Sequence, residues 1–101
     1  MKVNVEVDTL LNKIVKDLED VKAKDIQIIN IKNRSALGDY MVIVSGTSSR
    51  HINSIVSNIV KLNKTHILST EGINSTDWLI VDFGDIILNV FIPETREHYS
   101  L

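Results

Sequence analysis

The stretch EGINSTDWLIVDFGDIILNVFIPE, residues 71–94, decides the fold. It holds the only tryptophan of the chain and two runs of apolar, mostly β-branched residues. The pattern predicts a strand over 78–81, a tight turn at 83–84 and a returning strand over 86–92. Two such runs joined by a glycine-bearing turn favour an antiparallel hairpin. We therefore expect this hairpin to form the buried part of a sheet.

Trp78 is the residue of this stretch that most favours a contact surface. Alternation along the predicted strand places Trp78 and Ile80 on one face with Asp82, and leaves Leu79 and Val81 on the other. A single Trp that opens a strand is most often a core residue, but tryptophan is also enriched in binding hot spots. The pattern indicates a sheet with one face for the core and one for a partner.

The remainder of the chain supplies two helices and three more strands. Apolar residues at helical spacing predict an amphipathic helix from about Asp8 to 22–24, and a second that follows a capping residue among 47–49 and ends near 62. Further apolar runs predict strands over 26–31, 40–44 and 66–70. The last residues, 94–100, could form a helical turn or two. The strand-helix-strand segment over 40–70 favours a parallel pair with a right-handed crossover. We predict an α/β fold, a mixed sheet of about five strands with two main helices packed on it.

Length and composition limit the architecture and the location. The chain has 101 residues, which suits one domain over 1–101. No apolar run approaches the ~20 residues that span a bilayer. The first residues lack the apolar core of a signal peptide, and cysteine is absent. We therefore expect a cytoplasmic protein that has no membrane partner.

Charge is distributed unevenly along the chain. Residues 1–64 hold ten Lys or Arg against seven acids, whereas residues 65–101 hold one Arg against six acids. A nucleic-acid-binding protein usually carries a basic excess, so we expect no sequence-specific contact with nucleic acid. The acidic third suits a basic protein partner through complementary potential. A merely solvated acidic surface is the alternative.

No motif for a cofactor or for catalysis emerges. Asp82-Phe83-Gly84 spells the magnesium-binding triplet of protein kinases, but the other kinase motifs are missing, so we interpret it as a turn. Residues 45–49 precede a predicted helix, where they can cap it or hold an anion; we favour the cap. The three histidines lack the spacing of metal ligands, and no Ser-His-Asp order is recognisable. We expect no cofactor, no metal and no enzymatic activity.

Three segments together resemble the ribosomal silencing factors, also called the Iojap-related family. They are GTSSRH at 46–51, the pattern EGxNSxDWxxVDxGD over 71–85, and the pair Arg96 and Tyr99. The similarity covers nearly the whole chain. It implies a nucleotidyltransferase-like fold without transferase activity, and homodimers in the free state.

The resemblance also implies a function and a contact region. Members bind ribosomal protein fourteen of the large ribosomal subunit, block joining with the small subunit and lower translation when nutrients are scarce. On this basis we expect Trp78 and Phe83 to be apolar anchors, Asp82 and Asp85 to face basic residues, and the pair Arg96 and Tyr99 to frame the patch.

Two departures from the family pattern and two alternatives stay open. Asn89 stands where many relatives have a histidine, and the sequence ends at Leu101 where many relatives continue. A role in assembly of the large subunit would use the same binding site. A nucleotide-binding enzyme that uses residues 46–49 for phosphates is the less favoured alternative, because no carboxylate pair follows to hold magnesium.

Overall fold

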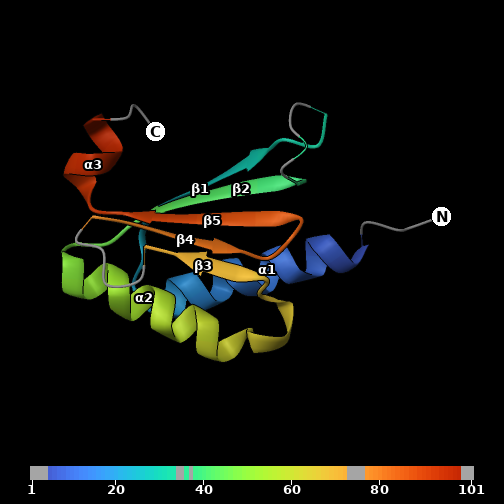
Figure 1. Cartoon of the computed structure of the whole chain (residues 1–101), viewed down its shortest axis with the longest axis horizontal. Helices are drawn as coiled ribbons and strands as arrows, with labels where there is room; N and C mark the ends of the chain where they lie inside the picture. The colour runs from blue at the N-terminus through green and yellow to red at the C-terminus, as the bar shows by residue number, and fades with distance from the viewer. Residues whose placement is uncertain (1–4, 34–35, 37, 73–76, 99–101) are drawn as a thin grey trace.

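A five-stranded mixed sheet forms the centre of the molecule (Figure 1). The computed structural model describes residues 5–33, 36, 38–72 and 77–98. The strands are β1 (Lys24–Asn30), β2 (Tyr40–Ser45), β3 (Ser69–Glu71), β4 (Trp78–Asp82) and β5 (Ile86–Phe91), in the order β1-β2-β5-β4-β3. β2 and β5 run parallel, and the other paired strands run antiparallel. The predicted mixed sheet and the β4–β5 hairpin are confirmed.

The parallel pair differs from the one that the sequence favours. The segment after the second helix forms only the short edge strand β3, which pairs antiparallel with β4. The parallel neighbour of β2 is β5. A strand at the centre of a sheet is covered on both faces and needs apolar residues. Ser69, Thr70 and Glu71 do not meet that need, whereas all of β5 except Ile87 is buried.

Two helices cover one face of the sheet. Figure 1 shows α1 (Val5–Asp20) and α2 (Ser49–Leu62) on the same side, whereas the short α3 (Pro93–His98) lies on the other. A 3-10 turn, η1 (Lys64–His66), links α2 to β3. α1 begins before Asp8, so this residue does not cap it; its carboxylate accepts a hydrogen bond from the Tyr40 hydroxyl at 3.0 Å. Ser48 is the N-cap of α2, as the sequence allows.

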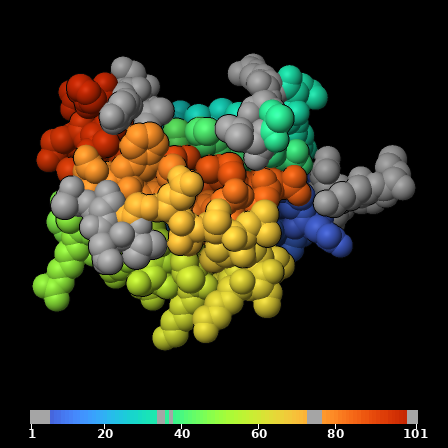
Figure 2. Space-filling view, in the orientation of Figure 1, coloured from blue at the N-terminus to red at the C-terminus, as the bar shows by residue number. Residues whose placement is uncertain are grey.

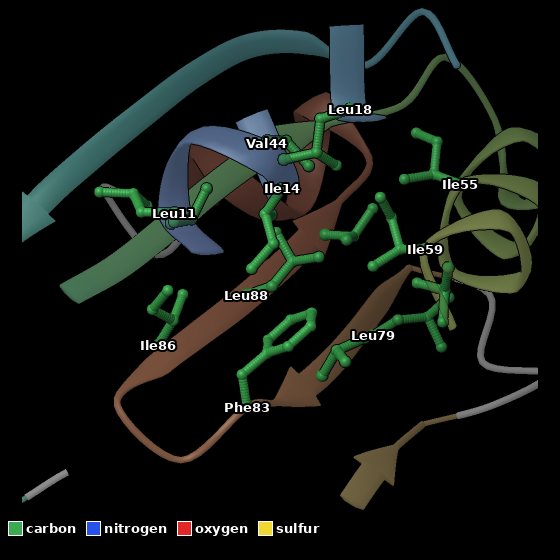
Figure 3. Close-up of a cluster of buried hydrophobic side chains, with 14 of the residues drawn as sticks. Leu11, Ile14, Leu18, Val44, Ile55, Ile59, Leu79, Phe83, Ile86 and Leu88 are labelled. Atoms are coloured by element: carbon green, nitrogen blue, oxygen red, sulfur yellow. The ribbon is translucent and has the colours of Figure 1, made fainter. Parts of the chain in front are cut away.

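The hydrophobic core lies between the sheet and these two helices (Figure 3). Leu79 and Val81 are fully buried there, while Trp78, Ile80 and Asp82 are partly exposed, which confirms the predicted alternation of β4. Each helix and each of the three inner strands contributes aliphatic side chains to this layer, among them Ile14, Leu18, Val42, Val44, Ile55, Ile59, Ile86 and Leu88. The core thus fixes which face of the sheet is left open.

The turn of the hairpin lies one residue later than predicted. The Phe83 N–H donates to the Ile86 carbonyl at 2.9 Å, so the two turn residues are Gly84 and Asp85. Gly84 has φ +93°, a left-handed value that glycine adopts without steric cost. Phe83 therefore continues the ladder, and its side chain joins that of Val81 on the core side.

Candidate partner-binding face

The face of the sheet opposite α1 and α2 is the candidate functional surface, and we call it the open face. Register and alternation place side chains from all five strands on it: Gln27, Ile29, Met41, Ile43, Glu71, Trp78, Ile80, Asp82, Ile87, Asn89 and Phe91. Its apolar members Ile29, Met41, Ile80 and Ile87 are only half-buried. In Figure 2, surface of β2 and of the β4–β5 hairpin is visible between α3 and β1. Half-buried apolar side chains gathered on one face are typical of a contact surface.

Trp78 is fixed at the end of the open face nearest α3. Its ring lies 4.8 Å from that of Phe91, centroid to centroid, with 32° between the planes. Its indole N–H donates to the Asn89 Oδ1 at 3.2 Å. Phe91 is fully buried and Asn89 is 7% exposed, and both belong to β5, the central strand of the sheet. The indole is therefore held in place before any partner arrives.

The structure separates the two aromatic residues that were expected to act together. Phe83 is 7% exposed and packs in the core on the opposite face from Trp78. The reason is parity, because Phe83 is an odd number of positions from Trp78 along a continuous ladder. Phe83 is thus not a surface anchor in this structure.

The two predicted carboxylates lie at the hairpin turn, far along β4 from Trp78. One Asp82 oxygen accepts the Gly84 N–H at 2.7 Å, so this side chain shapes the turn. The Asp85 carbonyl accepts the N–H groups of Asp39 and Tyr40 at 2.8 and 3.0 Å, which ties the turn to the start of β2. Both residues have a local structural role, and only Asp82 projects on the open face.

Arg96 holds α3 against the sheet. Its Nη1 donates to the Asp25 carbonyl at 2.7 Å and to the Ser45 Oγ at 2.8 Å, at the β1–β2 end of the open face. Trp78 and Ser45 both pair with Phe91, so Arg96 and Trp78 share one end of the sheet. Tyr99, the other residue expected to frame the patch, lies outside the described residues.

The turn before α2 is held by hydrogen bonds within the chain. The Gly46 N–H donates to the Phe91 carbonyl at 2.8 Å, and the Thr47 N–H donates to His51 Nδ1 at 2.9 Å. The His51 N–H in turn donates to the Ser48 Oγ at 3.1 Å. Since these donors already have acceptors, the geometry favours the capping interpretation of residues 45–49 over phosphate binding.

Within the part of the chain that the structure describes, no three His, Asp or Glu side chains gather as metal ligands would. Over the same residues, no helix is both long and apolar enough to cross a bilayer.

Among the residues of the open face that sequence reasoning missed, Asn89 and Glu71 bear most directly on the surroundings of Trp78. Asn89 appears in the sequence as a polar interruption of the apolar run 86–92, and its position diagonal to Trp78 across the hairpin could have suggested the hydrogen bond. Glu71 pairs with Ile80 across β3 and β4. No sequence signal identified it, because the register of the short β3 cannot be derived from its pattern.

Comparisons with known proteins identify the family and support the fold. A family model described as "Ribosomal silencing factor during starvation" matches residues 4–101. The chain is 35% identical over 97 residues to the ribosomal silencing factor RsfS of Zymomonas mobilis, covering 93% of this chain and 73% of that protein. It is 38% identical over 98 residues to mouse mitochondrial assembly of ribosomal large subunit protein 1, covering 90% of this chain and 42% of that protein. The crystal structure of a Chromobacterium violaceum protein matches with a TM-score of 0.85 at 26% identity, over 99% of this chain and 82% of that one.

Proposed function

The chain belongs to the ribosomal silencing factor family, and from this premise we propose that it represses translation by binding the large ribosomal subunit and blocking its joining with the small subunit. The partner is ribosomal protein fourteen, and the contact uses the open face. The observation that carries this proposal is that the open face presents half-buried apolar side chains and a fixed Trp78, on the side of the sheet that α1 and α2 leave uncovered.

The size of the domain suits steric exclusion. Its longest principal dimension is 42 Å and its accessible surface is 6223 Å². A standard protein interface buries about 800 Å² on each partner, roughly an eighth of that surface. The remainder of the domain would project from the ribosomal protein into the space that the small subunit occupies on joining.

Charge supports a basic protein partner. Residues 65–101, which include β3, β4 and β5, carry one Arg against six acids. Complementary potential accelerates association and makes it sensitive to salt. A basic ribosomal protein exposed at the surface of the subunit meets this requirement, and we place the encounter in the cytoplasm. In the free state, we expect two copies to associate as a homodimer.

Sedimentation with purified ribosomal particles tests the proposal. We expect the protein to sediment with isolated large subunits, not with small subunits, and to lower the yield of joined ribosomes as it is added. Trp78→Ala should weaken binding about thirtyfold, as loss of an anchor does. Leu62→Ala is the matched control, since Leu62 is an apolar residue 51% exposed at the end of α2, away from the open face. Absence of any association would refute the proposal.

A role in large-subunit assembly is the second candidate, and the mouse relative favours it by its name. The same binding face would serve both roles, so timing distinguishes them. In cells depleted of the protein, an assembly factor leaves precursors of the large subunit, whereas a silencing factor leaves mature subunits that join too readily in starvation. Gradient profiles of growing and starved cells separate the two outcomes.

A further inference from the structure

We propose that a hollow on the open face beside Trp78 is a subsite for an arginine side chain of the partner protein. The hollow has a volume of about 190 Å³ and is lined by Glu71, Gly72, Trp78 and Ile80. The identity of the partner rests on the proposed function, whereas the chemistry of the subsite rests on these residues alone. Since a cavity of about 10–15 Å³ on this measure already holds one water molecule, the hollow is large enough for a guanidinium group.

The lining residues belong to two paired strands. Glu71 and Ile80 are direct partners across β3 and β4, and Trp78 lies two residues before Ile80 on the same face. Side chains at directly opposite and diagonal positions of an antiparallel pair are within reach of each other. A carboxylate, an aliphatic side chain and an indole therefore surround one space, and the register fixes their arrangement.

The indole can offer a ring surface but no further hydrogen bond. Its single N–H already donates to Asn89 Oδ1, and Phe91 packs against its ring. The indole has no hydrogen-bond acceptor. A partner group can therefore gain binding energy from this side chain only through apolar contact or through the π system. A cation is attracted to that system, most strongly over Trp. The fixed indole thus selects for an apolar or a positively charged group.

Glu71 decides between these two. Its side chain is exposed, and within residues 5–33, 36, 38–72 and 77–98 no basic side chain forms an ion pair with it. An apolar partner group would have to leave this carboxylate unpaired at the contact, which is costly. Arginine fits better than lysine, because a planar guanidinium stacks on an aromatic ring and can also bind a carboxylate with two hydrogen bonds.

Two pairs of variants test the subsite in the sedimentation assay with large subunits. Glu71→Gln should weaken binding about tenfold and reduce its salt dependence, whereas Glu19→Gln, the same charge change on the exposed side of α1, should leave both unchanged. Trp78→Phe and Trp78→Leu both lose the hydrogen bond to Asn89, but only Phe keeps a π surface. We expect the Phe variant to bind more tightly than the Leu variant by about fivefold.

A second measurement is independent of the ribosome. Trp78 is the only tryptophan, so its fluorescence and its indole N–H resonance report on the hollow directly. We expect titration with arginine amide to move both signals more than citrulline amide does, and Glu71→Gln to remove the difference. Equal responses to the two amides, or equal losses of binding for Glu71→Gln and Glu19→Gln, would overturn the subsite. If the wild-type protein does not bind large subunits, the proposed function fails and the titration alone decides the subsite.

Discussion

Replacing Phe83 separates a core role from a binding role more clearly than any other substitution. Phe83 follows β4, its N–H pairs with the Ile86 carbonyl, and its ring joins the core beside Val81 and Ile86. Phe83→Ala therefore removes buried apolar surface without touching the open face. We expect a large loss of stability and, for the molecules that remain folded, normal binding to the large subunit.

The magnitude follows from the burial. A fully buried Phe→Ala change costs about 3–5 kcal/mol, the sum of lost transfer energy and the cavity that stays behind. Phe83 is 7% exposed and borders a surface hollow with Leu10 and Ile86, so solvent and neighbours can fill part of the gap. We therefore expect about 3 kcal/mol. A domain of 101 residues has a free energy of unfolding of roughly 5–15 kcal/mol, so the variant stays folded but only marginally.

Urea unfolding measures the loss, with the slope of the transition as a check that the unfolded state is unchanged. Phe83→Leu is the control, because it keeps most of the volume and should cost about 1 kcal/mol. Binding is then measured at a temperature where both variants are folded. If Phe83→Ala were to unfold like the wild type and lose its affinity for the large subunit, Phe83 would be a surface anchor and the assignment to the core would be wrong.

Three further substitutions test other parts of the structure. Gly46→Ala should cost about 1–3 kcal/mol by thermal unfolding, because a Cβ at this position would lie 2.6 Å from Ile52 Cγ2 and force α2 away from the sheet; an unchanged melting temperature would contradict the close approach. Asp82→Ala should cost about 1 kcal/mol in urea unfolding, since the Gly84 N–H loses its acceptor; Asp82→Asn, which keeps an oxygen, should cost less, and the reverse order would exclude the turn role. Arg96→Ala should raise the hydrogen-exchange rates of α3 amides while the free energy of global unfolding changes by about 1 kcal/mol or less; unchanged exchange in α3 would show that Arg96 does not hold it.

The sequence predicted the elements of the hairpin because their pattern is local. Alternation in β4 sorted Trp78 from Leu79 correctly, and the apolar run over 86–92 identified β5 as a buried strand. Ser48 was among three candidate caps for α2, since the types that cap helices are few. These assignments depend on residues within a few positions of each other, so one sequence suffices for them.

Pairing between distant segments was harder to predict. β5, the parallel partner of β2, begins 46 residues after β2 begins. β3 is too short for its sequence pattern to show that it is an edge strand. Phe83 was expected at the contact because of the family resemblance. The turn lies one residue later than the pattern indicated, so Phe83 continues the alternation of β4 and its side chain lies on the core side. Of the two expected aromatic anchors, Trp78 lies on the open face and Phe83 lies in the core.

The β4–β5 hairpin contributes side chains both to the core and to the open face, and this explains why its polar residues matter. Asn89 is the only polar side chain of β5, and it lies on the open face, where its Oδ1 fixes the indole of Trp78. Asn89→Leu would remove that acceptor. The hydrogen bond would then no longer hold the indole ring in the orientation that a cation needs. A histidine at this position could keep the bond only through an unprotonated ring nitrogen. The position thus controls how firmly the aromatic wall of the hollow is held, and affinity should follow that rigidity rather than the apolar area alone.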